Sequence, residues 1–375
     1  MGGVYIHQQK DWPTFKWDNA ALAPLLADVR LRQGRFLGRM EAIGFELRDE
    51  SVLTTLTEDV VKSSEIEGEN LDREQVRSSI ARRLGVSAAG LIPSSRDVDG
   101  VVEMMLDATQ AFKEPLTTER LFGWHSALFP TGYNSLIKIT VGGWRNDKNG
   151  PMQVVSGAMG RERVHYEAPI ASRLRKEMTA FLKWFEKDVS IDPVIKAGVA
   201  HLWFVTIHPF DDGNGRIARA LADLQLSRAE HTAQRFYSMS SQICAERKNY
   251  YSVLESTQKG GLDITLWLRW FLKCLDHSFD LAETTLSTVL KKACYWDWFR
   301  EEPISQRQRI VLNRLLDNFE GQLTSSKWAK LAKCSQDTAA RDIEDLVSRG
   351  ILVKGEAGGR STSYMLAEPP KLIRK

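Results

Sequence analysis

Residues 208–219 read HPFDDGNGRIAR, and this stretch lies between two segments with helical patterning. Gly213 and Gly215 have no Cβ, so the backbone there can bring its N–H groups close to a ligand. Those groups open the second helix, and the N-terminus of a helix binds phosphate. Arg216 and Arg219 lie three residues apart on the first turns of that helix, where two guanidinium groups can clamp a polyphosphate. The stretch therefore predicts a phosphate-binding turn in a mostly helical chain.

Two further residues of the same stretch carry chemistry. His208 ends the first helix and can act as a base near neutral pH. Asp212 is a hard oxygen ligand beside the phosphate-binding turn, which suits Mg²⁺. Each feature alone is more typical of a structural histidine or a solvated loop. Their joint occurrence within one short stretch indicates phosphoryl or nucleotidyl transfer with a metal.

The same stretch matches the Fic-family motif HPFx[D/E]GNGRxxR at every defined position, and the chain resembles that family over about residues 60–290. The resemblance implies that His208 deprotonates a hydroxyl group of a target protein and that Asp212 holds Mg²⁺ against the α- and β-phosphates of ATP. It also implies that Arg219 reaches the γ-phosphate, while Phe210 anchors the loop in the core. The implied nucleotide-binding residues are Gly213, Asn214, Gly215, Arg216, Ile217, Ala218, Arg219 and, on a later helix, Tyr251.

The reaction that the resemblance implies is protein adenylyl transfer. AMP moves from ATP to a Ser, Thr or Tyr hydroxyl group of a target protein, and pyrophosphate is released. Transfer of another nucleotide or of phosphocholine, and removal of AMP, are alternatives at the same site. An intact Arg219 favours a triphosphate donor, because such a donor has a γ-phosphate to bind. A DNA-binding regulator whose helical core senses a ligand is an alternative from a different class.

A second short pattern lies N-terminal to this motif. Residues 63–68 read SSEIEG and match the family's inhibitory pattern [S/T]xxxE[G/N], at the end of a helix expected over residues 51–68. The resemblance implies that Glu67 pairs with Arg219, removes the partner of the γ-phosphate and so inhibits the enzyme. A carboxylate and a guanidinium form a strong pair when they are shielded from water. The alternative is a glutamate at a helix end that faces solvent.

Two β-prone runs, MQVVS and RVHYE, predict a hairpin within residues 144–166. This hairpin resembles the family's flap, which pairs with an extended segment of a target protein by strand addition. An ordinary surface hairpin is the alternative. Tyr250 and Tyr251 resemble the aromatic residue of the family's adenine pocket. We favour Tyr251, although spacing alone does not separate the two and buried core tyrosines are the alternative.

The expected fold is mostly α and has three parts. They are a helical and aromatic cap region over residues 1–50, a Fic catalytic domain with a β-hairpin flap over residues 51–300, and a winged helix-turn-helix over residues 301–375. The last part is assigned from three helical segments followed by two short β runs. Its third helix carries Arg341 and Arg349 beside three acidic residues, which is a thin basic surface for DNA. DNA binding, protein recognition and formation of a homodimer are therefore alternative roles.

Composition limits the class of protein. The 375 residues are 43% hydrophobic and 26% charged with a net charge of +3, which is typical of globular domains and does not argue for nucleic acid or a membrane. The four cysteines form no CxxC pair and indicate reduced thiols in a cytoplasm. No signal peptide is expected, and no apolar stretch reaches the ~18 residues of a membrane helix. Among the other histidines, His201 is expected in the core, and no role is assigned to His125 and His165.

Overall fold

The computed structural model describes residues 4–42, 45–86, 90–134, 137–148, 150–157, 161, 163–187, 189–316, 319, 321–355 and 362–367. The chain divides into two compact units, Met1–Glu283 and Thr284–Lys375, within helix α11 (Thr265–Trp298). The sequence placed this boundary near residue 300. The observed division falls earlier because Tyr295 and Phe299 belong to the hydrophobic core of the second unit.

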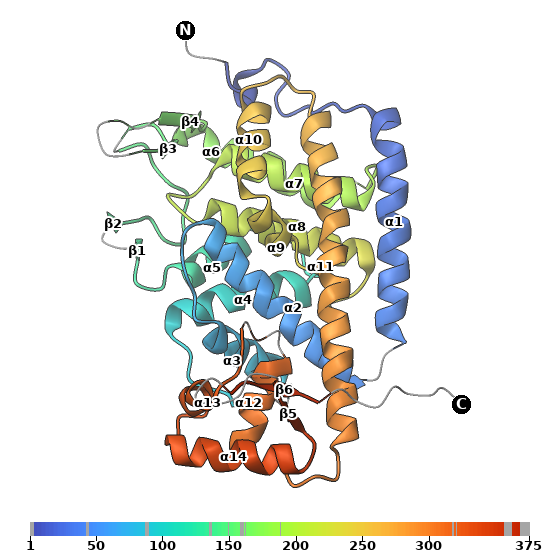
Figure 1. Ribbon diagram of the computed structural model, residues 1–375. Helices are drawn as coiled ribbons and strands as arrows, with labels where there is room; N and C mark the ends of the chain where they lie inside the picture. The colour runs from blue at the N-terminus through green and yellow to red at the C-terminus, as the bar shows by residue number, and fades with distance from the viewer. Residues whose placement is uncertain are drawn as a thin grey trace. The chain divides into compact units, whose positions relative to one another are not determined.

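The first unit is mostly helical (Figure 1). In chain order its helices are η1 (Ile6–Gln8), α1 (Asn19–Glu41), α2 (Phe45–Ile66), α3 (Arg73–Leu84), α4 (Arg96–Gln110), α5 (Thr118–Leu128), α6 (Ala171–Lys187), α7 (Pro193–Ile207), α8 (Asn214–Glu230), α9 (Met239–Ala245), α10 (Arg247–Gln258) and the first part of α11. Helices α7 and α8 pack against each other at its centre, and α2 and α4 contact α8. Every residue of α7 from Val194 to Ile207 is buried, as expected for a helix that is apolar on all sides.

The two ends of the segment between α2 and α3 follow the sequence signals. Gly68 comes just after the end of α2 with φ 88°, a left-handed conformation that glycine adopts without strain. Asp72 accepts a hydrogen bond from the Gln75 N–H at 2.9 Å, so it caps α3 as expected. The turn between these two residues is therefore defined at both ends, and it carries Glu69.

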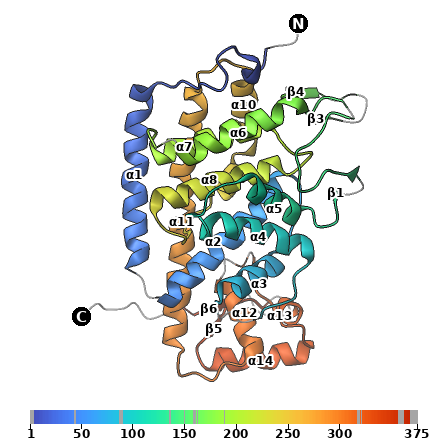
Figure 2. The same ribbon diagram turned by 180° about the vertical axis from the view of Figure 1, so that it is seen from behind.

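Four short strands lie on one side of the first unit in both views (Figures 1 and 2). They form two antiparallel pairs, β1 (Tyr133–Asn134) with β2 (Ile137–Lys138), and β3 (Gln153–Ser156) with β4 (Arg163–Glu167). The β3–β4 pair is the hairpin that the sequence predicted, and its register shifts between Val154 and Val155. Residues 149, 158–160 and 162 of the expected flap lie outside the described residues.

The N-terminal region packs onto the first unit. Trp12 and Phe15 contact Trp203 of α7 edge-on, with ring centroids 6.3 and 5.7 Å away. Helix α1 lies beside α11 (Figures 1 and 2), and Arg32 of α1 pairs with Asp276 of α11 at 3.3 Å. The aromatic residues that the sequence singled out therefore contribute to the core of the same unit that contains the 208–219 motif.

The second unit has its own core. It contains the end of α11, α12 (Gln306–Leu316), α13 (Ser325–Leu331), α14 (Gln336–Ser348) and the antiparallel strands β5 (Leu352–Lys354) and β6 (Tyr364–Leu366). Trp328 and Leu346 are fully buried in this core, and the Ser335 side chain caps α14. The expected order of three helices followed by two strands is present. No helix within the described ranges is both long enough and apolar enough to span a membrane.

Candidate active site

The turn between α7 and α8 places His208 and Gly213 in left-handed backbone conformations. His208 follows the last residue of α7 with φ 51° and ψ 59°. Gly213 precedes α8 with φ 79°, and a Cβ at this position would lie 3.0 Å from the Phe129 ring. A positive φ is strained for a residue other than glycine. The contacts around the turn must therefore hold His208 in place.

Phe210 anchors this turn in the core, as expected. Its side chain is fully buried, and its ring stacks on the His125 imidazole with centroids 4.2 Å apart and 7° between the planes. The Asn214 side chain accepts from the Phe210 N–H at 3.0 Å and donates to the Phe210 carbonyl oxygen at 2.9 Å. The side chain of Asn214 therefore shapes the turn. The group of Asn214 that could contact an anion is its backbone N–H.

Arg145, at the start of the flap segment, holds the turn from another side. Its Nε donates to the His208 carbonyl oxygen at 2.7 Å, and its backbone N–H donates to the Pro209 carbonyl oxygen at 3.0 Å. The guanidinium also pairs with Asp147 at 2.9 Å, and Arg145 is buried. Sequence reasoning missed this residue, because no pattern links two positions that are 63 residues apart.

The His208 imidazole is set up to accept a proton. Its Nδ1 lies 3.2 Å from the Val205 carbonyl oxygen, which can only accept a hydrogen bond. Nδ1 therefore carries the ring proton, and Nε2 carries the lone pair. Burial lowers the pKa of His208 to about 4, so the ring is neutral at pH 7. A neutral imidazole with this tautomer is competent as a general base.

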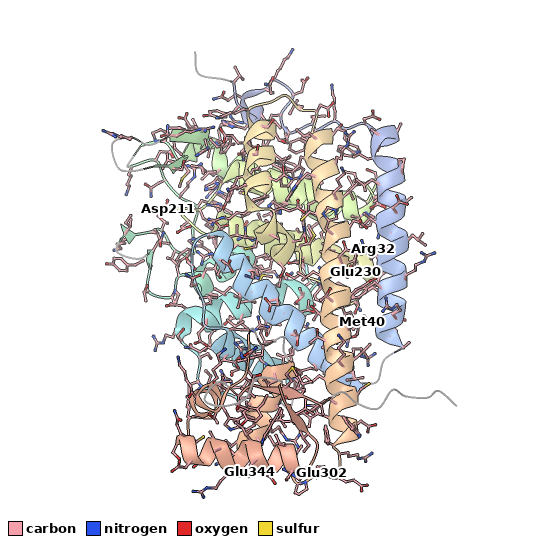
Figure 3. The ribbon with its side chains drawn as sticks, in the orientation of Figure 1. Arg32, Met40, Asp211, Glu230, Glu302 and Glu344 are labelled. Carbon is pink, nitrogen blue, oxygen red and sulfur yellow. The ribbon has the colours of Figure 1, made fainter. Side chains whose placement is uncertain are left out.

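Asp212 presents one carboxylate at the side of the turn. Asn134 of β1 donates to this carboxylate, and the Nε2 of His125 lies 3.2 Å from the Asp212 carbonyl oxygen. The neighbouring Asp211 lies on the side of the unit that carries both strand pairs (Figure 3). Among the residues that the structure describes, no three His, Cys, Asp or Glu side chains gather into a metal site. Mg²⁺ is commonly bound by one or two carboxylates together with substrate phosphates, and Asp212 fits that mode.

Both arginines of the motif are buried near the start of α8, and each meets a carboxylate. Arg219 Nη2 lies 2.8 Å from Glu67 Oε1, and Arg219 also donates to Ser63 through Nε. Arg216 Nη1 lies 2.6 Å from Glu69 Oε2. The Nε of Arg216 and the Nη1 of Arg219 are buried N–H donors without a hydrogen-bond partner in the described part of the chain. Buried donors are normally satisfied, and phosphate oxygens would satisfy these two.

The Glu67 carboxylate lies where the phosphate-binding turn would receive an anion. A Cβ on Gly215 would come within 2.1 Å of Glu67 Oε1, so glycine at this position admits the carboxylate. Gly215 is the second residue of α8, and the N–H groups of a first helical turn attract anions. The pair between Glu67 and Arg219 that the sequence predicted is therefore present, with 30% of the Glu67 side chain still exposed.

The two neighbouring tyrosines of α10 have different environments. Tyr250 is buried, and its hydroxyl lies 3.1 Å from the Nε2 of His201, which is in the core as expected. Tyr251 is 38% exposed, and its hydroxyl donates to the Ile66 carbonyl oxygen at the end of α2. Tyr250 is thus a core residue, whereas Tyr251 offers ring surface. The choice of Tyr251 as the adenine contact stays a prediction.

The β4 strand of the flap is fixed to α10 through Glu255. Its carboxylate lies 3.1 Å from Arg163 Nη2, 2.7 Å from His165 Nδ1 and 2.6 Å from Lys259 Nζ. Burial raises the pKa of Glu255, but hydrogen bonds from these three side chains outweigh burial and lower the pKa to about 2. Glu255 is therefore ionised at neutral pH, and His165, which had no assigned role, helps to hold β4.

The geometry defines a class of protein: a helical protein with two buried arginines near the start of a helix and a neutral histidine on the preceding turn. Residues 115–226 match the model of the "Fic/DOC family". Residues 5–86 match a second family, described as a "Domain of unknown function (DUF4172)". Glu67 and Glu69 lie within this second region.

Curated relatives share a part of the chain. A "Protein adenylyltransferase Fic" from Nematostella vectensis is 36% identical over 124 residues, which cover 32% of this chain and 27% of that protein. A protein of the same name from Drosophila ananassae is 34% identical over 106 residues, which cover 28% of this chain and 20% of that protein. The chain therefore spans less than a third of the length of these relatives.

Solved structures share the fold. A Fic family protein from Desulfovibrio desulfuricans G20 matches with a TM-score of 0.53 and 20% identity, over 94% of this chain and 97% of that chain. A Fic domain containing signaling protein from Bacteroides thetaiotaomicron VPI-5482 matches with a TM-score of 0.51 and 20% identity, over 69% of this chain and 97% of that chain. These likenesses confirm the mostly helical fold class that the sequence predicted.

Proposed function

We propose that this chain is a protein adenylyltransferase that moves AMP from ATP to a Ser, Thr or Tyr hydroxyl group of a target protein. One observation carries the proposal: Arg216 and Arg219 hold buried N–H donors without partners, near the start of α8 and on the same motif as the neutral His208. A triphosphate supplies oxygen atoms to these donors. Relatives named as protein adenylyltransferase Fic support the same activity.

In the proposed reaction, His208 Nε2 takes the proton of the target hydroxyl group while the hydroxyl oxygen bonds to the α-phosphorus of ATP. The bond from the α-phosphorus to its bridging oxygen breaks, and pyrophosphate leaves with the electron pair. Mg²⁺ on Asp212 would offset the charge of the α- and β-phosphates. The motif residues that would surround the phosphates are Gly213, Asn214, Gly215, Arg216, Ile217, Ala218 and Arg219.

The proposed enzyme is inhibited by its own carboxylates. Glu67 neutralises Arg219 and approaches the start of α8, so it competes with a γ-phosphate for both groups. Glu69 pairs with Arg216 in the same way, which supports a second inhibitory contact. Both carboxylates come from the segment that follows α2. Withdrawal of this one segment would therefore remove the carboxylate partners of both arginines.

A target protein is the partner that the flap supports. An extended target segment would add to the β3–β4 pair by backbone hydrogen bonds.

For the second unit, contact with protein or dimer formation is better supported than contact with DNA. Arg349 is already paired with Asp345 and Glu302, and Arg307 with Asp342, so these guanidinium groups are not free to neutralise DNA phosphates.

Intact-mass analysis of the Glu67→Gly protein after incubation with ATP and Mg²⁺ tests the activity. We expect a mass gain of one AMP or a multiple of it on the chain or on an added target, with a smaller gain in the wild type. The same protein with His208→Ala added should show no gain. A gain from another nucleotide or phosphocholine donor, or loss of AMP from a modified protein, would favour the alternative reactions. No change with any donor would refute the proposal.

A further inference from the structure

His7 is a buried histidine that the proposed reaction does not use. It lies in η1, and its Nδ1 is 3.0 Å from the hydroxyl oxygen of Tyr166 on β4. Tyr166 is also buried, and its hydroxyl oxygen lies 2.6 Å from the Thr206 carbonyl oxygen in the last turn of α7. Two hydrogen bonds in series therefore join the N-terminal segment, the flap and the helix that ends next to His208.

The direction of these two hydrogen bonds is fixed. The Thr206 carbonyl only accepts, so the Tyr166 hydroxyl donates its single hydrogen to it. The hydroxyl must then accept from His7, whose Nδ1 carries the ring proton. Burial, and to a smaller extent the charge of Arg173, lowers the pKa of His7 to about 4, so the ring is neutral at pH 7. Burial raises the pKa of Tyr166, so its hydroxyl keeps the hydrogen that it donates.

The Thr206 carbonyl belongs to the last turn of α7, whose carbonyl groups lack partners within the helix. The two carbonyls before it are bonded to His208 itself. The Phe204 oxygen accepts from the His208 N–H at 3.0 Å, and the Val205 oxygen accepts from the His208 Nδ1 at 3.2 Å. The Thr206 oxygen instead receives its donor from Tyr166. The three bonds together fix the helix end that sets His208 in its left-handed conformation.

The segment around His7 is itself held in place. The Tyr5 ring packs edge-on against the Tyr166 ring with centroids 5.2 Å apart. Arg173 of α6 donates to the His7 carbonyl oxygen at 3.3 Å, and Trp12 Nε1 donates to Glu177 of the same helix at 2.8 Å. His7 is therefore a fixed point against which the Tyr166 hydroxyl can be oriented.

We propose that His7 is a positioning residue for His208, which orients the Tyr166 hydroxyl onto the Thr206 carbonyl and so holds the catalytic helix end and the flap in register. The effect on catalysis rests on the proposed transfer of AMP, whereas the effect on His208 does not. The proposal gives a role to the first residues of the region that matches a family of unknown function. Residues 5–86 then contain both the residue that positions His208 and the two carboxylates that contact Arg216 and Arg219.

Substitution of His7 by asparagine or by glutamine tests which of the two ring nitrogens is needed. The Asn amide lies near the place of Nδ1 and can donate to Tyr166, whereas the Gln amide lies near the place of Nε2. In the Glu67→Gly background we expect His7→Asn to keep kcat. His7→Gln and His7→Leu should lose about tenfold in kcat with an unchanged KM for ATP, because small displacements of a base slow the chemical step. Equal kcat in all three variants, or an equal loss in all three, would overturn the proposal.

A double-mutant cycle tests the route from His7 to His208. Tyr166→Phe removes the acceptor for His7 and the donor for Thr206 together. We expect it to lower kcat as His7→Leu does, and the combination of both changes to cause no further loss. Fully additive losses would show that the two side chains act separately, and the proposed route would be wrong.

A measurement on His208 itself does not require activity. Nitrogen NMR of protein with ¹⁵N-labelled histidine reports the tautomer and pKa of each imidazole, and His208→Ala identifies the signal of residue 208. We expect the His208 imidazole signals to shift in His7→Gln, because the helix end that holds the contact between Nδ1 and the Val205 oxygen is loosened, and to keep their positions in His7→Asn. If this shift appears in a Glu67→Gly background that transfers no AMP, the proposed function fails and the positioning role stands. If AMP is transferred and neither kcat nor the His208 signal responds to His7→Gln or His7→Leu, the positioning role fails.

Discussion

Glu67 Oε1 lies 2.8 Å from Arg219 Nη2 and occupies space that a Cβ on residue 215 would fill. One carboxylate therefore contacts a motif arginine and approaches the start of the helix that the motif opens. The carboxylate comes from the region that matches a family of unknown function, whereas both partners come from the region that matches the Fic/DOC family. The two matched regions thus meet at the start of α8.

Glu67→Gly should raise AMP transfer and lower thermal stability. The Arg219 guanidinium is 1% exposed, and loss of a charge-assisted hydrogen bond to it costs about 2 kcal/mol, less some screening by solvent. We expect a lower midpoint of thermal unfolding in Glu67→Gly than in the wild type. ATP with Mg²⁺ should recover more stability in the variant, because the phosphate replaces the carboxylate. Equal recovery in both proteins would contradict competition for Arg219.

Glu69→Gln tests whether the second carboxylate acts together with the first. Glutamine keeps the length of the side chain but removes the charge that lies 2.6 Å from Arg216 Nη1. In calorimetric titration with ATP and Mg²⁺ we expect binding roughly threefold to tenfold tighter than in the wild type, as loss of about 1 kcal/mol of competing interaction implies. Binding to the variant with both Glu67→Gly and Glu69→Gln should be tighter than to Glu67→Gly alone.

Glu58→Gln is the matched control for this experiment. Glu58 lies on α2, the helix that precedes Glu67 and Glu69, but it pairs with Arg73 rather than with a motif arginine. We expect its ATP affinity to equal that of the wild type. An equal gain in Glu58→Gln and Glu69→Gln would mean that the helix loosens as a whole and that Glu69 has no specific effect on Arg216.

Gly215→Ala should couple to Glu67. The added Cβ would lie 2.1 Å from Glu67 Oε1, but 3.3 Å from Arg219 Nη1, so most of the clash disappears when Glu67 is absent. Urea unfolding should therefore show a larger loss of stability from Gly215→Ala in the wild type than in Glu67→Gly, with a coupling of about 1 kcal/mol or more. Strictly additive losses would show that the carboxylate does not occupy this space in solution.

The parts of the site that were predicted are those whose residues stand together in the sequence. The stretch 208–219 is contiguous, so its glycines, its buried Phe210 and its two arginines follow from local geometry and one recognisable motif. Glu67 was found through a second short pattern. Glu69 was missed although it follows by two residues, because that pattern ends at Gly68 and spacing alone does not show which carboxylate of a turn faces the helix.

The long-range contacts had no signal in a single sequence. Arg145 reaches the His208 carbonyl across 63 residues, Asn134 reaches Asp212 across 78, and His7 meets Tyr166 across 159. These pairings depend on how the flap and the N-terminal segment fold back onto α7, and helical or strand periodicity carries no information about that. The division between Glu283 and Thr284 differs from the boundary expected near residue 300 for the same kind of reason, because helical periodicity does not show which of two cores the end of α11 joins.

The first unit should lose stability in mild acid because it contains buried histidines. Burial is the main cause that lowers the pKa of His7 and His125 to about 4 and that of His201 to about 3. The unfolded chain takes up these protons near the ordinary value of 6.5, so it binds more protons than the folded chain below that pH. The free energy of unfolding should therefore fall as pH decreases from 6.5 to about 4, by about 1.4 kcal/mol per pH unit for each such histidine.

His201→Gln separates this effect from the protonation of carboxylates at lower pH. The Gln amide lies near the place of Nε2 and can keep the contact with the Tyr250 hydroxyl, now 3.1 Å long, but it does not titrate. In urea unfolding between about pH 7 and pH 5, the free energy of the first unit should depend less steeply on pH in His201→Gln than in the wild type. The sign follows from linkage, since a group with a lowered folded pKa contributes stability above its unfolded pKa and loses it as pH falls. An unchanged slope would mean that His201 is protonated or exposed in the folded protein, against its position in the core.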